Sequence, residues 1–251
     1  MTLDRRKFFA SMGGAGAAAV GFGLGGRAKA IVLPRARVDD RQDDGAMIEC
    51  AETPLEDLMQ EHAVLERVML IYEEGGRRLE AGLEVAPEVL AHAGGIVRHY
   101  IEDHHERDEE QHIFPRLERV GVAVELVHTL LAQHVAGRKL TSEIIGLSTA
   151  ASLRDNSDRA RLVHAMRQFV RMYRPHAARE NTVLFPAFRK ALSQSEYEAL
   201  RESLERSEEE TFGGQYFETI MAEVVRLEAA FDIGELASFT PIDRHGTTTA
   251  K

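Results

Sequence analysis

A histidine followed four residues later by a glutamate occurs twice in this chain, in matching surroundings. His105 precedes Glu109, and the same pattern recurs further along the chain as His176 before Glu180. A Phe-Pro pair begins five residues after each glutamate. Residues i and i+4 are neighbours on one face of a helix, so both side chains of a pair can reach the same metal ion. The repeated spacing therefore predicts two equivalent pairs of metal ligands.

Two further histidines, His62 and His134, follow the same repeat, because their separation along the chain is only one residue longer than that between the two motifs. All six residues interrupt apolar stripes with three- and four-residue steps, which are typical of the buried face of a helix. A buried carboxylate without a positive partner is costly, so glutamates in these stripes indicate bound cations. Two helical hairpins related by a pseudo-twofold axis would place all six around two metals. The predicted ligands are His62, His105, Glu109, His134, His176 and Glu180.

Other polar residues near these stripes are candidates for supporting roles. His112 lies seven residues after His105, where it is a fifth ligand, a partner of a ligand or a residue at the bundle edge. Arg138 follows His134 by one turn, and a buried arginine needs a carboxylate partner. His104 lies a quarter-turn off the stripe and is expected at the surface. No role is predicted for His92, His99, His128, His164 or His245.

The periodicity predicts an all-α protein. Thr53-Pro54 is typical of an N-cap followed by proline at the first helical position, and Gly75-Gly76 is expected to loosen the end of this first helix. Gly213-Gly214 is a candidate break in an acidic fifth helical stretch. Long helices with short connections favour an antiparallel four-helix bundle with an additional C-terminal helix. The expected helical stretches are about 54–76, 87–121, 127–145, 162–183 and 195–231, with a turn-rich break at 152–157.

The combined motifs resemble the hemerythrin-like, His-His-Glu cation-binding domain family over residues 54–231. The resemblance implies a four-helix bundle around a non-haem centre of two iron ions, and the six residues above fall on the family's ligand positions. The motifs that carry it are Glu61-His62, His105-x3-Glu109 before Ile113-Phe114-Pro115, Gln133-His134-x3-Arg138, and His176-x3-Glu180 before Leu184-Phe185-Pro186.

The chain departs from hemerythrins proper, which carry five histidines, two of them on the third helix, and an aspartate motif on the fourth. Here Leu130 and Arg138 lie one turn from His134, and the fourth helix carries Glu180 instead of an aspartate. The chain is therefore more similar to the bacterial hemerythrin-like branch. Oxygen transport does not carry over directly.

The ligand count indicates what the centre can do. Imidazole and carboxylate suit iron, manganese or zinc. Two roughly octahedral metals offer about twelve positions, of which four imidazoles, two bridging glutamates and an oxo or hydroxo bridge fill about ten. About two open positions allow small ligands to bind. We expect binding or sensing of dioxygen or nitric oxide at two iron ions. The alternatives are a di-iron oxidase, peroxidase or nitric-oxide-handling enzyme, an iron-handling protein, and a structural zinc bundle.

Residues 1–30 match an export signal, with a basic start, an apolar Gly/Ala stretch and a small-residue cleavage site. The Arg5-Arg6 pair before Phe8-Phe9 resembles a twin-arginine signal, which implies export by the twin-arginine machinery to a bacterial periplasm. An uncleaved membrane anchor is the alternative. Residues 31–53 and 232–251 are expected to be flexible tails. Cys50, the single cysteine, cannot form an internal disulfide.

The charge balance excludes one class of partner. The formal net charge is −10, and residues 1–30 hold five basic side chains and one acid, so the remainder is still more acidic. Such a body repels nucleic-acid phosphates and anionic membrane surfaces, so neither partner is expected. No stable membrane insertion is expected after cleavage. The sequence does not indicate an oligomeric state.

Overall fold

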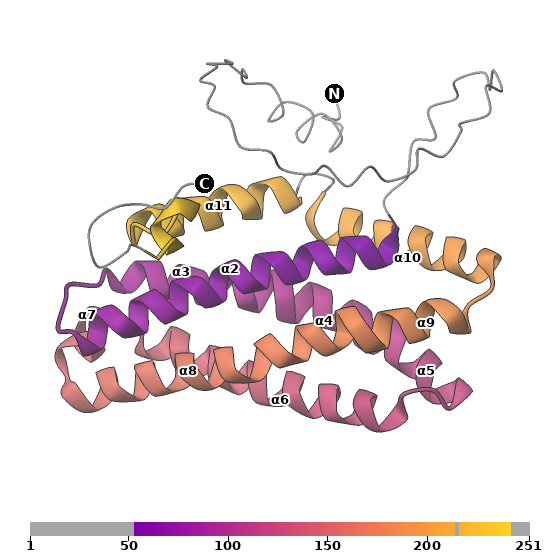
Figure 1. Ribbon diagram of the computed structural model, residues 1–251, viewed down its shortest axis with the longest axis horizontal. Helices are drawn as coiled ribbons and strands as arrows, with labels where there is room; N and C mark the ends of the chain where they lie inside the picture. Colours follow the sequence, from indigo (N-terminus) through magenta and orange to yellow (C-terminus); the bar gives the residue numbers. More distant parts are fainter. Residues whose placement is uncertain (1–52, 214–215, 242–251) are drawn as a thin grey trace, which may run out of the picture. The chain divides into compact units, whose positions relative to one another are not determined.

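The computed structural model describes residues 53–213 and 216–241, and these residues form helices and loops without a strand. Four long helical rods lie side by side, and two further helices run along one side of the bundle (Figure 1). The predicted all-α four-helix bundle with additional C-terminal helix is therefore confirmed. The predicted signal at 1–30, Cys50, His245 and the tail segments 31–52 and 242–251 lie outside the described residues.

Two of the rods are single helices and two are built from consecutive helical segments. The first and third rods are α2 (Pro54–Glu80) and α6 (Val124–Leu147). The second rod consists of α3 (Pro87–Ile96), η1 (Val97–His105), α4 (Glu106–Asp108), η2 (Glu109–Ile113) and α5 (Phe114–Val120). The fourth rod consists of α8 (Asn156–Arg179), η3 (Glu180–Leu184) and α9 (Phe185–Ala191), and the short α7 (Ala150–Arg154) precedes it. α2 and α6 each pack against both α3 and α8, which closes the bundle.

Two helix ends follow clear local signals, whereas one glycine pair does not end its helix. Thr53 forms a capping box with Glu56, in which each side chain bonds the other's backbone N–H, and Gly121 ends the second rod in the left-handed conformation, with φ +70°. The prediction that Gly75-Gly76 loosens the end of the first helix is wrong, because α2 continues to Glu80. A Cβ at Gly75 would lie 2.8 Å from a methyl carbon of Leu90. The close approach of the second rod explains a glycine in this helix.

Each glutamate of the His-x3-Glu motifs begins a π-helical turn. η2 starts at Glu109 and η3 starts at Glu180, and both turns lead into a helix with proline at its second residue, Pro115 or Pro186. Proline has no N–H to donate, and its ring clashes with the carbonyl four residues earlier, so the preceding turn opens into a wider one. π turns inside α-helices occur frequently at functional sites. The Phe-Pro repeat therefore accounts for a matching local geometry beside both glutamates.

The C-terminal region covers one side of the bundle. It comprises α10 (Gln194–Phe212), α11 (Tyr216–Ala230) and the 3-10 helix η4 (Leu236–Phe239). α10 packs on α2, and α11 packs on α2 and α3. The expected break is present, because α10 ends at Gly213 with φ +65°. The guanidinium of Arg67 on α2 pairs with Glu228 of α11, which ties this cover to the bundle.

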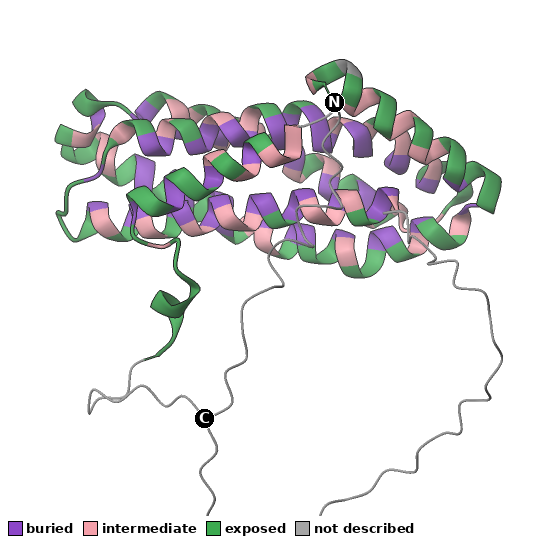
Figure 2. Cartoon of the chain, turned by 90° about the horizontal axis from the view of Figure 1, so that it is seen from above, coloured by how far each residue is buried: buried purple, intermediate pink, exposed green. Residues whose placement is uncertain are grey.

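Buried residues alternate with exposed ones along the helices of the bundle (Figure 2). The apolar ones form two separate clusters, one including Tyr72, Leu90 and Phe169, the other including Phe114 and Phe185. On every rod the candidate ligands lie between residues of these two clusters. The polar centre is thus sealed by apolar packing at both ends. None of the described helices is both long enough and apolar enough to cross a membrane.

Candidate metal centre

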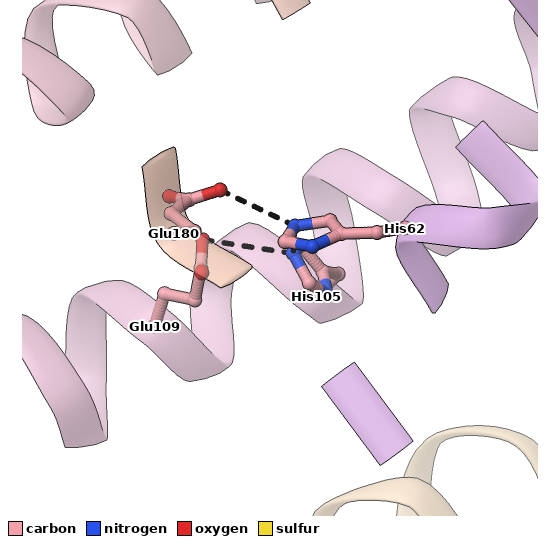
Figure 3. Close-up of side chains that lie close together, drawn as sticks. All are labelled: His62, His105, Glu109 and Glu180. Carbon is pink, nitrogen blue, oxygen red and sulfur yellow. Dashed lines mark hydrogen bonds and ion pairs between the residues drawn. The ribbon is translucent and has the colours of Figure 1, made fainter. Parts of the chain in front are cut away.

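The structure brings the six predicted ligands together in the middle of the bundle. One histidine comes from α2 and one from α6, and the second and fourth rods each contribute a histidine and the glutamate one turn later. All six are between 0% and 4% exposed to solvent. Figure 3 shows four of them, His62, His105, Glu109 and Glu180, with their polar atoms turned toward one another.

The first group of possible ligand atoms comes from His62, His105, Glu109 and Glu180. The Nε2 atoms of the two histidines lie 2.9 Å apart. Glu180 Oε2 lies 3.2 Å from His62 Nε2, and Glu109 Oε2 lies 3.7 Å from His105 Nε2. The four ligand atoms all lie within 4.8 Å of one another, close enough to hold one metal ion.

The second group mirrors the first with His134 and His176 and shares both glutamates. The Nε2 atoms of these histidines lie 3.2 Å apart. Glu180 Oε1 lies 3.1 Å from His176 Nε2, and Glu109 Oε2 lies 3.5 Å from His134 Nε2. Glu180 therefore directs one oxygen toward each group, and Glu109 Oε2 lies near a histidine of each. Both carboxylates occupy positions from which they can bridge two metal ions.

The state of the two glutamates fits bound cations. None of the four carboxylate oxygens of Glu109 and Glu180 accepts a well-formed hydrogen bond within the described residues, although all four are buried. Burial and the neighbouring Glu180 raise the pKa of Glu109 well above its ordinary value. Burial also acts against ionised Glu180, but the nearby rings of His176 and His62 hold its pKa below the ordinary value. Metal cations would satisfy both carboxylates in their ionised form.

A second ring of side chains orients the four histidines. Each Nδ1 lies at hydrogen-bond distance from an amide or carboxylate oxygen, which can only accept, so Nδ1 carries the proton. The Nε2 lone pair of each imidazole is then directed inward and free to bind a metal. The accepting atoms are Asn181 Oδ1 for His62 (2.7 Å), Glu61 Oε2 for His105 (2.7 Å), Glu110 Oε1 for His134 (2.9 Å) and Gln133 Oε1 for His176 (2.9 Å).

These four partners were not predicted as site residues, although the sequence contained a signal for them. Glu61 and Gln133 each directly precede a single histidine, and Glu110 and Asn181 each directly follow a motif glutamate. They therefore repeat along the chain with the same spacing as the ligands beside them. Each group holds one histidine supported by a carboxylate and one supported by an amide, so the two positions have matched surroundings.

The prediction that His104 lies at the surface is wrong, because only 2% of it is exposed. Its Nε2 lies 3.2 Å from Glu61 Oε1, and its ring meets that of Phe212 on α10 edge-on at 5.0 Å. Burial would raise the pKa of Glu61, but hydrogen bonds from His104 and His105 lower it to about 2. His104 thus helps to keep an anion beside a candidate ligand. The packing of α10 on this face could not be predicted from the periodicity of the second rod.

The remaining candidates lie outside the two ligand groups. His112 is partly exposed and lines a surface pocket with Arg107 and residues of α10, so the structure does not bring it to the centre. Arg138 Nη2 pairs with Glu110 Oε1 at 2.7 Å and with Glu106 Oε2 at 2.9 Å, rather than with the two shared glutamates. The histidines to which no role was assigned are exposed where they are described: His92, His99, His128 and His164.

Comparison with known proteins agrees with this geometry. The Hemerythrin HHE cation binding domain matches residues 53–150 and again residues 125–238. Uncharacterized protein Rv1995 of Mycobacterium tuberculosis and Uncharacterized protein Mb2018 of Mycobacterium bovis are each 39% identical to the chain over 201 residues, which cover 80% of this chain and 79% of each relative. No solved structure matches the chain. The chain belongs to the hemerythrin HHE cation-binding domain family.

Proposed function

We propose that this protein holds two iron ions with the six clustered side chains and binds or senses dioxygen or nitric oxide there. The observation that carries the proposal is the sharing of Glu109 and Glu180 between two groups of inward-facing histidine nitrogens. Two bridging carboxylates and four imidazoles form a donor set that suits iron, with manganese and zinc as competitors. Of about twelve coordination positions on two octahedral ions, the six side chains and an oxo or hydroxo bridge would fill about ten. About two positions would stay open for an external ligand.

The protein itself holds the metal ligands, fixes their orientation and excludes water from the centre. The Nδ1 partners fix the direction of each imidazole, and Glu109 and Glu180 would bridge two bound ions. Phe185 stacks on the ring of His62 and Phe114 stacks on that of His134, which restricts water on the side of the second apolar cluster. When bound, iron would supply the open positions and the change of oxidation state on which binding of a diatomic ligand depends.

Metal analysis of the purified protein tests this proposal. We expect two irons per chain, with oxo-bridge charge-transfer absorption in the near-ultraviolet, and a spectral change when dioxygen or nitric oxide meets the reduced protein. Stoichiometric zinc in protein from iron-replete cells would contradict the iron assignment. Iron without any spectral response to either gas would contradict the ligand.

The open positions also favour a second candidate, in which the bound ligand is turned over. A di-iron oxidase, peroxidase or nitric-oxide-handling enzyme would consume its ligand over many cycles with an electron donor, whereas a carrier or sensor would regain its first spectrum when the gas is removed. An iron-handling protein would instead exchange its metal with a chelator within minutes. Spectral reversal, turnover and exchange rate therefore separate the three functions in one preparation.

We also propose that residues 1–30 direct the folded protein through the twin-arginine machinery to the periplasm. The support is the Arg5-Arg6 pair ahead of a weakly apolar stretch. Replacing both arginines with lysine (Arg5→Lys and Arg6→Lys together) should retain the protein in the cytoplasm of a bacterial host. Unchanged appearance in the periplasmic fraction would argue against this route.

A further inference from the structure

A row of three glutamates runs along the second rod beside the metal centre. Glu102, Glu106 and Glu110 follow one another at four-residue intervals and therefore share one helix face. Glu102 and Glu106 are 2% and 1% exposed, and Glu110 is partly exposed at the end nearest the centre. None of the three belongs to the six clustered ligands. Glu106 and Glu110 form, with His134, a third group of ligand atoms close enough together to hold a metal ion, but Glu102 belongs to no such group among the described residues. A buried carboxylate outside every candidate metal site requires another explanation.

The row is connected to the centre by a chain of polar contacts. Glu110 accepts a hydrogen bond from the Nδ1–H of His134, and Arg138 pairs with both Glu110 and Glu106. The hydroxyl of Tyr173 donates to Glu106 Oε1 at 2.6 Å. A change of charge at the metal centre therefore changes the electrostatic potential at the three glutamates. The effect is strong because the polar groups between them are ordered and lie in a buried environment of low dielectric.

Glu102 lies at the end of this row furthest from Glu110. All four rods contribute polar side chains to its surroundings. Arg98 Nη1 lies 2.5 Å from Glu102 Oε2, and the side chain of Arg98 is 27% exposed, which connects the site to solvent. The other charged or titratable groups that face Glu102 are Glu106 on its own rod, Tyr72 on α2, Arg138 on α6 and Tyr173 on α8, and the hydroxyl of Thr141 on α6 lies beside it.

Several of these groups have polar atoms whose bonding is incomplete. The buried hydroxyl of Tyr72 has no hydrogen-bond partner within the described residues, and that of Thr141 makes no well-formed hydrogen bond there. Within the described part of the chain, the three carboxylates of the row pair with two guanidiniums, those of Arg98 and Arg138. A proton on Glu102 would remove the excess charge and supply a donor for a neighbouring oxygen.

The repeat shows that the fold itself does not require this row. When His105 is aligned with His176, Glu102 corresponds to Tyr173, Glu106 to Ala177 and Glu110 to Asn181. The fourth rod thus presents the same ligands without the carboxylate row. The carboxylate row is therefore present beside the centre on the second rod and missing from the equivalent positions of the fourth rod.

We infer that Glu102 is a proton-binding site, coupled through the carboxylate row to the charge of the metal centre. When the centre gains an electron from a reductant, the Glu102 carboxylate takes up a proton from solvent on the Arg98 side and becomes a carboxylic acid. When a one-electron oxidant takes that electron, the proton leaves by the same side. Atoms and charge balance, because one proton accompanies the added electron.

The pKa of Glu102 lies near neutral pH, where a small change in nearby charge can change its protonation. Burial raises the pKa of Glu102 to about 7, with Glu106 acting in the same direction. The adjacent hydroxyl of Thr141 and the charges of Arg98 and Arg138 only partly oppose this increase. A group with a pKa near the ambient pH responds most strongly to a small change in nearby charge.

Infrared difference spectroscopy of the metal-loaded protein, oxidised against dithionite-reduced at pH 7.5, tests the inference. We expect a carboxylic-acid carbonyl band on reduction and proton uptake approaching one per chain, reported by an indicator dye. Glu102→Gln should lose the band and most of the uptake, with unchanged metal content. Thr141→Val should keep the band at a shifted frequency. Glu118→Gln, on the surface, should resemble the parent protein.

The inference rests on the proposed redox-active centre, and the outcomes separate the two. If the metal absorption changes on reduction while Glu102→Gln keeps the band and the proton uptake, the proton site is wrong and the centre stands. If the metal absorption of the parent protein does not respond to dithionite, the proposed function fails. In that event the band should still titrate near neutral pH in the parent protein and be missing from Glu102→Gln. A band that is absent in both would overturn the proton site as well.

Discussion

The two helical hairpins of the bundle carry equivalent ligands in different surroundings. The first hairpin is α2 with the second rod, and the second hairpin is α6 with the fourth rod. Ligands and their Nδ1 partners repeat between them, but His104 corresponds to Pro175 and Asp108 to Arg179. The positions that touch the candidate metals are therefore duplicated, and the positions behind them are not. Differences in reactivity between the two metal positions should originate in this outer layer.

The cover provided by the C-terminal helices explains part of this difference. α10 and α11 pack on the first hairpin, where Ser207 of α10 donates to buried Asp108 and Phe212 meets His104. Among the described helices, neither α10 nor α11 packs extensively on α6 or α8. An open groove of about 680 Å³ lies between α6 and α8, with Gln133 in its lining. Polar side chains can remain buried on the first hairpin because α10 supplies their partners.

Removal of a ligand should have the largest effect and should treat the two hairpins alike. His105→Ala and its counterpart His176→Ala are each expected to lose at least one of two metals, and Glu109→Ala both, because Glu109 lies between the two groups. Stability should fall with the metal, since metal binding favours the folded state. Elemental analysis with thermal unfolding measures this. His128→Ala, 58% exposed, should change neither, and metal loss there would contradict the ligand assignment.

Removal of an Nδ1 partner should instead distinguish the hairpins. Loss of such a partner typically costs roughly 10- to 100-fold in metal affinity. We expect Glu61→Ala to approach the upper limit, because it removes a charge-assisted hydrogen bond and leaves His104 without its acceptor. Gln133→Ala removes only a neutral amide and should approach the lower limit. Competition with a chelator gives both affinities, and equal losses would show that the buried His104 has no influence.

A substitution on α6 should test how tightly Tyr173 is held. A Cβ at Gly137 would lie 1.9 Å from the Tyr173 hydroxyl oxygen, so Gly137→Ala should destabilise the fold by about 1–3 kcal/mol through overpacking. Gly146→Ala on the same helix meets nothing within 4 Å and should stabilise by roughly 0.5–1 kcal/mol. Urea unfolding of both variants measures the difference. A harmless Gly137→Ala would mean that the Tyr173 hydroxyl can leave Glu106 at little cost.

A pH dependence of stability should belong to the first hairpin alone. Glu102 has an ordinary pKa of 4.5 when unfolded and a pKa of about 7 in the metal-free fold, so the folded state binds its proton more tightly. This stabilisation is complete below pH 4.5 and is lost as the pH rises to about 7. It amounts to at most about 3 kcal/mol. Urea unfolding of metal-free Glu102→Gln should show a flatter pH profile, and an unchanged slope would contradict the raised pKa.

The fold and the central ligands could largely be predicted from the sequence, because local spacing determines them. The i, i+4 pairs, the internal repeat and the apolar stripes depend only on helical geometry, and they predicted the six side chains that the structure brings together. Helix ends such as those at Thr53 and Gly121 also depend on short-range capping and backbone conformation. Such signals extend over a few residues and do not require knowledge of the packing.

What only the tertiary structure decided was which polar residues are enclosed behind the ligands. Gly75 lies inside α2 because Leu90 packs against it, and His104 is buried because Phe212 and the rest of α10 cover it. Glu102 faces Arg98 on its own rod but Tyr72 and Thr141 from two others. Burial and pKa depend on neighbours that are distant in the sequence, and the helical period of one segment carries no information about them.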